Sequence, residues 1–256
     1  MVIEQLKELL DQRFTLYNTP DFISTDPISI PHRFSKREDI EVAAFFSATI
    51  AWGNRASIVK NGQRLMQLMD EAPYDFVMNA SSSELKRLSG FVHRTFNADD
   101  AYFFTEALRN IYLNHQGPEQ VFAEGLKTGN RQMDNAIVYF RKIFLETPHL
   151  QRSEKHIANP ARGSSAKRIN MFLRWMVRND NFGVDFGIWK NLSPADLYCP
   201  LDVHSGNVAR KLGLLSRKQN DWQAAAELTG NLRKLDPQDP VKYDFALFGM
   251  GVFEKF

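Results

Sequence analysis

Apolar residues recur every three or four positions along most of the chain, which is the spacing of an amphipathic helix. The first such stripe lies in residues 2–17 and consists of Ile3, Leu6, Leu9, Leu10 and Phe14. The alternation of apolar and polar residues that is typical of strands is nearly absent. The pattern therefore predicts an all-α fold.

Helix starts are predicted where a side chain can accept hydrogen bonds from the first free N–H groups of a helix. Four such starts are the capping box Ser35–Glu38 and the polar positions Asn54, Ser81–Glu84 and Asn97. The first is expected to open an apolar helix through Trp52, and Gly117-Pro118 should stop the last. Further helices are expected over residues 118–127, 131–146, 167–179, 203–213, 221–235 and 240–250.

The length of 256 residues fits one large domain or two small ones. We expect a single helical unit over residues 1–256, with one subdomain at residues 36–146 and a second at residues 147–256 together with residues 1–35. Proline, glycine and serine concentrate in two linkers, residues 147–166 and 180–200. These linkers flank the helix that is expected to begin at Lys167.

The hydrophobic fraction of 43% is ample for a buried core. The net charge of +2 is unevenly distributed: residues 151–180 hold seven Lys and Arg against two acids, whereas residues 1–50 hold five against eight. Such a basic segment indicates either a surface that faces a polyanion or a solvated helix face.

The single cysteine, Cys199, excludes an internal disulfide and a thiolate-bound iron–sulfur cluster or zinc site. One cysteine fits a reducing cytoplasm, where we expect the protein to reside. No apolar run approaches the length of a membrane span, and the first residues do not form a signal pattern. The six histidines show no pairing at metal-ligand spacing, so no required metal is expected. No cofactor is expected either.

Two segments carry candidate chemistry. In the first, Gly163-Ser164-Ser165-Ala166 leads directly into a helix that starts with Lys167-Arg168. Free N–H groups at a helix start, together with the helix dipole, favour an anion, and the lysine and arginine add positive charge. The alternative is an ordinary connection between helices.

In the second segment, Asp202 follows Pro200-Leu201 at the start of a helix that ends in Leu212-Gly213-Leu214. Asp202 is well placed to cap this helix. A carboxylate held by a helix end is also held in one geometry, which catalysis requires. Asp202 therefore has a predicted structural role and a candidate catalytic one.

Together the two segments resemble motifs of the helix-hairpin-helix DNA glycosylases. Members of that superfamily carry a hairpin Gly-x-Gly-x-Lys before a helix, and a Val-Asp-Thr-His-type motif at the start of a later one. The matching positions are Gly163, Ser165, Lys167, Asn170, Leu201–His204, Val208, Arg210, Leu212–Leu214 and Asp236–Val241. The likeness covers roughly residues 36–70 and 150–250, and within the superfamily the chain is most like an uncharacterised bacterial domain-of-unknown-function family.

The chain departs from the glycosylase pattern in three respects. Ser165 replaces the second hairpin glycine, and the four-cysteine cluster of the endonuclease III branch is missing. Lys167 and Asp202 are 35 positions apart, a long gap that resembles the archaeal 8-oxoguanine branch. The extra loop, with Phe186 and Trp189, either lines a pocket or covers the core.

The resemblance implies two helical subdomains flanking a basic cleft, and a DNA glycosylase/AP lyase that removes a damaged, oxidised base. Lys167 would be the Schiff-base nucleophile, and Asp202 the carboxylate that stabilises positive charge on the sugar. The partner would be double-stranded DNA bound by a monomer. Its backbone would be held by Gly163, Ser164, Ser165 and Arg168.

The base must leave the stack before its glycosidic carbon is accessible. The candidates for a wedge or pocket are Trp52, Asn54, Arg55, Phe186, Trp189 and His204. Core packing is the alternative for Trp52, helix capping for Asn54, and structural support for His204.

Two other functions fit the same residues. The first is a non-catalytic helix-hairpin-helix protein that binds nucleic acid, in which Lys167 only contacts a phosphate. The second is a vestigial glycosylase fold that serves as an interaction scaffold.

Overall fold

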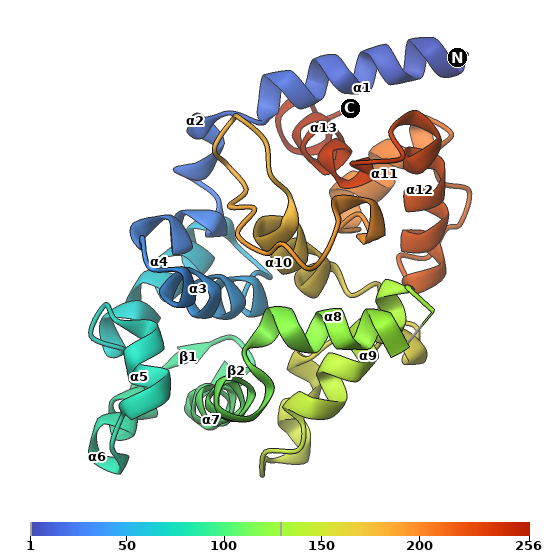
Figure 1. Ribbon diagram of the computed structural model, residues 1–256. Coiled ribbons are helices and arrows are strands. Elements are labelled where there is room, and N and C mark those ends of the chain that lie inside the picture. Colours follow the sequence, from blue (N-terminus) through green and yellow to red (C-terminus); the bar gives the residue numbers. More distant parts are fainter. Residues whose placement is uncertain (1, 129) are drawn as a thin grey trace. The chain divides into compact units, whose positions relative to one another are not determined.

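The computed structural model describes residues 2–128 and 130–256, and its described part is predominantly helical with one two-stranded sheet (Figure 1). The prediction of an all-α protein is confirmed. The chain divides into two compact units: unit 1 comprises the residues up to Phe22 together with Asn159–Phe256, and unit 2 comprises Ile23–Ala158. The boundaries expected near residues 35 and 147 both fall inside unit 2.

Unit 2 contains seven helices and a hairpin of two short strands among its described residues. These elements are α3 (Arg37–Thr49), α4 (Arg55–Leu68), α5 (Pro73–Asn79), α6 (Ser82–Leu85), β1 (Val92–His93), β2 (Phe96–Asn97), α7 (Ala98–His115), α8 (Pro118–Thr128) and α9 (Met133–Phe144). Helices α8 and α9 pack along each other, and α7 packs against both. The core between α3, α7 and α9 holds four phenylalanines, Phe45, Phe104, Phe140 and Phe144, whose contacting rings have centroids 4.9–5.8 Å apart.

Three of the four predicted helix starts in unit 2 are confirmed. Asn54 caps α4, Asn97 caps α7, and Ser81 caps α6. The prediction of a capping box at Ser35 was wrong. Helix α3 begins at Arg37, and its N-cap residue, Lys36, has no side-chain acceptor. Because the helix starts one residue later than the box requires, Glu38 occupies the second helical position instead of the third and cannot complete the box.

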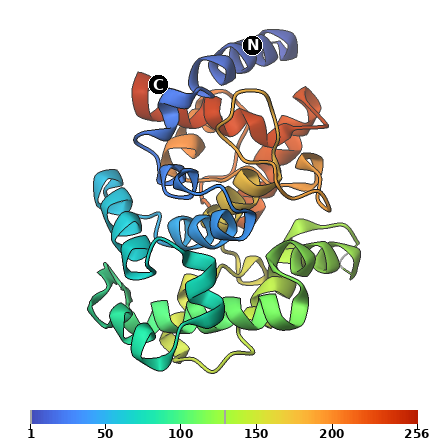
Figure 2. The same cartoon turned by 60° about the vertical axis from the view of Figure 1, so that its left-hand side comes forward.

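Unit 1 is built from α1 (Ile3–Tyr17), α10 (Lys167–Val177), α11 (Val203–Lys211), α12 (Trp222–Leu235) and α13 (Tyr243–Gly249), with the short α2 (Pro20–Ile23) at its boundary. Helix α1 runs alongside α13, and α13 also packs against α11 (Figures 1 and 2). The helix expected at residues 240–250 is divided into a 3-10 turn, α13 and a π-helical turn over Met250–Glu254. The apolar core of unit 1 includes Leu10, Leu201, Val208, Leu228 and Leu247.

A network of buried ion pairs fixes α10 within unit 1. Arg174 Nε lies 3.2 Å from Asp185 Oδ1, and Arg174 also binds Asp244. Arg178, one turn later, pairs with Asp185 at 3.1 Å and with Asp239 at 2.8 Å. Removing one partner of such a pair leaves a buried charge without compensation. The network therefore holds α10 in one orientation toward α13 and the 180–190 loop.

Cys199 is buried and free, and burial raises the pKa of its thiol well above the ordinary range. No helix within residues 2–128 or 130–256 combines the length and the apolar character that crossing a bilayer requires.

Candidate functional site

The two residues singled out from the sequence meet in the structure. Lys167 is the first residue of α10, and Asp202 is the residue immediately before α11. The Lys167 Nζ atom lies 3.6 Å from Asp202 Oδ2, with the lysine side chain 28% exposed and the aspartate side chain 21% exposed. An amine and a carboxylate 35 positions apart in the sequence thus form one partly exposed pair.

The Asp202 carboxylate divides its two oxygens between two tasks. Oδ1 accepts a hydrogen bond from Ser205 N at 3.0 Å, and the Ser205 hydroxyl accepts one from Asp202 N at 3.0 Å, which completes a capping box. The other oxygen, Oδ2, faces Lys167. The predicted cap is confirmed, and it leaves one carboxylate oxygen oriented toward the amine.

The turn before Lys167 uses left-handed backbone at two positions. Gly163 has φ +84°, and Ala166, the residue before α10, has φ +53°. Ser165 therefore does not occupy a position that requires glycine, which explains how a serine fits there. Asn170, on the first turn of α10, donates from Nδ2 to Ser165 O at 3.2 Å and holds the turn against the helix.

The same turn is tied to the loop between α11 and α12. Trp222 N donates to Gly163 O at 3.1 Å, and Ser164 pairs with Asp221 as an isolated antiparallel bridge. The Asn220 side chain in that loop donates from Nδ2 to Asp202 O at 3.0 Å. The turn, the loop and the start of α11 are therefore one connected piece of structure.

A further acid, Asp244 on α13, lies near the pair and was not predicted from the sequence. Its side chain is buried and binds Arg174. Burial raises the pKa of Asp244 to about 6, against the opposing effect of Arg174, and the charges of Asp202 and Lys167 also act on it. The sequence offered one signal that could have found Asp244: it is the single acid in the apolar run from Tyr243 to Leu247.

The remaining candidates in unit 1 differ in exposure. Arg168 is half-buried at the second position of α10, and burial lowers the pKa of its guanidinium to about 10. His204 is exposed, with its ring 6.5 Å from that of Phe248. Phe186 is half-buried, whereas Trp189 is 1% exposed and packs edge-on against Phe172. Of the two aromatic residues of this loop, Phe186 is thus partly exposed and Trp189 lies in the core.

The three wedge candidates belong to unit 2, where each has a structural contact. The Trp52 ring stacks on His156, with centroids 5.7 Å apart. Asn54 Oδ1 accepts from Ser57 N at 3.1 Å as the cap of α4, and Arg55 pairs with Asp26 at 2.7 Å. The cap predicted for Asn54 is confirmed, and the wedge role stays a prediction.

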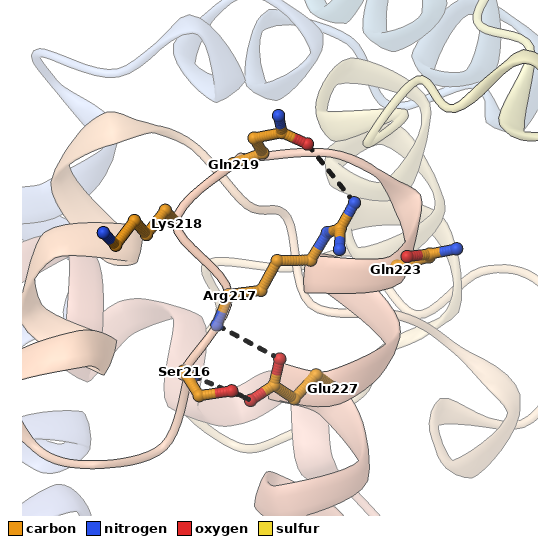
Figure 3. A pocket seen from close by; sticks show the side chains of 6 residues that line it. All are labelled: Ser216, Arg217, Lys218, Gln219, Gln223 and Glu227. Atoms are coloured by element: carbon orange, nitrogen blue, oxygen red, sulfur yellow. Dashed lines mark hydrogen bonds between the residues drawn. The ribbon is translucent and has the colours of Figure 1, made fainter.

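The loop after α11 borders a surface hollow of about 530 Å³ (Figure 3). Its lining is polar and consists of Ser216, Arg217, Lys218, Gln219, Gln223 and Glu227. In the part of the chain that the structure describes, no group of three or more His, Cys, Asp or Glu residues is arranged to hold a metal ion.

The fold and the pair define a helical protein with an amine and a carboxylate placed together at two helix starts. Residues 26–253 match the family described as "Protein of unknown function (DUF2400)", and the chain belongs to that family. No curated protein matches the chain. No solved structure matches it either.

Proposed function

We propose that this protein is a DNA glycosylase/AP lyase of the helix-hairpin-helix type, which removes a damaged, oxidised base from double-stranded DNA. Lys167 is its nucleophile, and Asp202 is the carboxylate that stabilises the positive charge on the sugar. The observation that carries the proposal is the 3.6 Å separation of Lys167 Nζ and Asp202 Oδ2.

The arrangement suits this chemistry because the main chain that carries Lys167 and the carboxylate of Asp202 are both held in place. Lys167 starts a helix whose far end is held by the Arg174 and Arg178 ion pairs. Asp202 is fixed by its capping box with Ser205. Groups held in a reactive geometry avoid the entropic cost of being brought together during the reaction.

In the reaction, the neutral Lys167 amine attacks C1′ of the sugar as the N-glycosidic bond breaks. The electron pair of that bond leaves with the base, and the base takes up the proton that the Lys167 nitrogen loses once it is bonded to C1′. The C1′–O4′ bond then opens, O4′ takes up a second proton, and a protonated Schiff base joins Lys167 to C1′. Asp202 Oδ2 stabilises the positive charge that develops at C1′ during these steps.

The turn over residues 163–166 is proposed to hold the DNA backbone. Gly163 and Ser164 are exposed, and Ser165 is half-buried. The turn precedes the N-terminus of α10, where N–H groups and the helix dipole favour a phosphate. Contacts of this kind position the duplex without reading its sequence.

The test is a borohydride trap on a panel of duplexes that each contain one oxidised base or an abasic site. Hydride adds to C1′ of the Schiff base and leaves a stable secondary amine that joins protein and DNA. Wild type is expected to form this adduct on at least one lesion, while Lys167→Gln forms none. If wild type neither traps nor releases a base on any member of the panel, the proposal fails.

A non-catalytic nucleic-acid-binding protein is the second candidate. It is favoured by the capping role of Asp202, which gives this residue a purpose without any reaction. This function requires salt-dependent DNA binding that survives Asp202→Asn, together with no base release.

A further inference from the structure

Asn220, in the loop between α11 and α12, binds the main chain of Asp202 from outside its helix. The Asn220 Nδ2 group donates to Asp202 O at 3.0 Å, and Asn220 Oδ1 accepts from Arg210 Nη2 at 2.6 Å. Two further bonds to the Asp202 main chain come from the start of α11 itself, through Ser205 Oγ and Gly206 N, each at 3.0 Å. Asn220 therefore connects Asp202 to a separate part of unit 1.

The Asn220 amide is held in one orientation. A guanidinium can only donate hydrogen bonds and a main-chain carbonyl can only accept them, so the amide oxygen faces Arg210 and the amide NH2 group faces Asp202 O. The Arg210 side chain is itself fixed, because it also donates to Arg217 O at 2.8 Å and to Lys218 O at 2.9 Å. The donor that binds Asp202 O is thus supported by a second, rigid contact.

Gly206 provides the room for this amide on α11. A β-carbon at position 206 would lie 3.0 Å from Asn220 Oδ1 and 2.9 Å from Arg210 Nη1. Both distances are shorter than the separation of about 3.5–4.0 Å at which non-bonded atoms pack best. Glycine is less favourable than alanine inside a helix, so its presence here has a packing reason.

The two residues after Asn220 bind the turn that precedes Lys167. The first pairs with Ser164 in an antiparallel bridge, and the second donates its N–H group to Gly163 O at 3.1 Å. Three consecutive residues of one loop thus connect the helix start that carries Asp202 to the turn that leads into Lys167.

We propose that Asn220 is a positioning residue of the reaction, which holds the Asp202 carboxylate in place beside the Lys167 amine. It acts through the main chain of Asp202 and takes no part in the chemistry itself. This inference rests on the proposed function, because it is that reaction which requires the two groups in a fixed geometry.

The first experiment measures the rate of borohydride trapping at saturating DNA, on the lesion duplex that wild type traps fastest. Asn220→Ala removes the bond to Asp202 O without adding a charge. It should slow trapping at least about tenfold, because a misplacement of about 1 Å can cost about a hundredfold. The DNA concentration that gives half of the maximal rate should stay within about twofold, since the lost interaction serves the reaction and not DNA binding.

The matched control for this substitution is Asn231→Ala. Asn231 is also half-buried in unit 1, and its Nδ2 group donates to Leu214 O at 2.8 Å. Each variant loses a bond of the same kind, so both should melt about 3 °C below wild type. Only Asn220→Ala should trap slowly.

A double-mutant cycle shows through which group Asn220 acts. In the Asp202→Asn background the carboxylate is absent, although the main chain that Asn220 binds is still there. Asn220→Ala should therefore slow trapping no further in this background. A general effect of Asn220 on the fold would slow trapping by the same factor with and without the carboxylate.

A second variant displaces the Asn220 amide without removing it. Gly206→Ala places a β-carbon against this amide, so trapping should slow at least about threefold. It should melt within about 3 °C of wild type, because the helix preference of alanine offsets the displacement. Its control is Gly230→Ala in α12, where the added β-carbon meets no other part of the chain within 4 Å and trapping should keep the wild-type rate.

The outcomes separate this inference from the proposed function. If wild type traps and Asn220→Ala traps as fast as Asn231→Ala, the positioning role is refuted while the glycosylase proposal stands. Equal slowing by Asn220→Ala with and without the Asp202 carboxylate refutes the positioning role as well. If wild type traps on no lesion duplex, the glycosylase proposal fails, and the positioning role, which requires that reaction, fails with it.

Discussion

Asp202 has two roles, as the cap of α11 and as the proposed catalytic carboxylate, and two substitutions separate them. Asparagine keeps the cap and alanine does not, whereas neither has a carboxylate. Asparagine caps a helix about as well as aspartate, so Asp202→Asn should keep the bond from Ser205 N. Alanine removes the cap. The catalytic carboxylate is lost in both variants.

The expected loss of stability and the expected loss of reaction rate differ widely in size. Loss of the cap costs about 1 kcal/mol, which lowers the melting temperature by about 3 °C for a chain of this size. The Lys167 pair adds little to stability, because both side chains are more than a fifth exposed. A carboxylate about 4 Å from the charge on C1′ is worth about 4 kcal/mol at an effective dielectric constant near 20, or about a thousandfold in rate.

The assay combines thermal unfolding with the rate of borohydride trapping at saturating DNA. Asp202→Asn should melt within about 1 °C of wild type, as expected for less than 0.3 kcal/mol, and trap about a thousandfold more slowly. Asp202→Ala should show the same slow trapping together with the lower melting temperature. An Asp202→Asn protein that traps at the wild-type rate refutes the catalytic reasoning, and one that melts like Asp202→Ala refutes the capping reasoning.

Four further predictions follow from the structure. Lys167→Arg keeps the positive charge, so DNA affinity by fluorescence anisotropy should stay within about twofold while trapping is abolished. Gly163→Ala places a side chain in open space but at φ +84°, so its cost in urea unfolding should be about 1 kcal/mol from the backbone alone. Asp100, in the first turn of α7, is buried, yet hydrogen bonds from His156 and Ser153 hold the pKa of its carboxyl well below the ordinary range. Its contribution to stability is therefore present above pH 3.8 and lost as pH falls further, and Asp100→Asn should weaken that loss in urea unfolding between pH 2 and 5. The pKa of Asp244 is raised to about 6, so its ionisation lowers stability as pH rises from about 4 to 6, and Asp244→Asn should remove this decline in the same measurement.

The parts of the fold that depend on local sequence were predictable. Asn54, Asn97 and Asp202 cap helices because the side chain and the N–H group that it binds are three residues apart. The capping box at Ser35 failed for a different reason. Its register differs by one residue, and the Asp39 side chain instead accepts a hydrogen bond from Tyr74 N, which is 35 residues away.

The candidate site was likewise predictable where it depends on local sequence and not where it depends on contacts between distant residues. Lys167 and Asp202 were found from their motifs, and the structure places them together. The ion pairs of Arg174 with Asp185 and Asp244 were not predicted, because charges 11 and 70 residues apart leave no periodic signal. The contact between Trp222 and the turn at Gly163 involves only main-chain atoms, which carry no residue-specific pattern.

The central claim is that the Lys167 amine becomes covalently attached to the sugar. The most direct measurement is mass spectrometry of the borohydride-reduced adduct after nuclease and protease digestion. We predict a sugar-derived mass increase on the Lys167 side chain, with none on Lys234, an exposed lysine in the last turn of α12 that serves as the control. An adduct located on another amine, with Lys167 unmodified, would contradict the account.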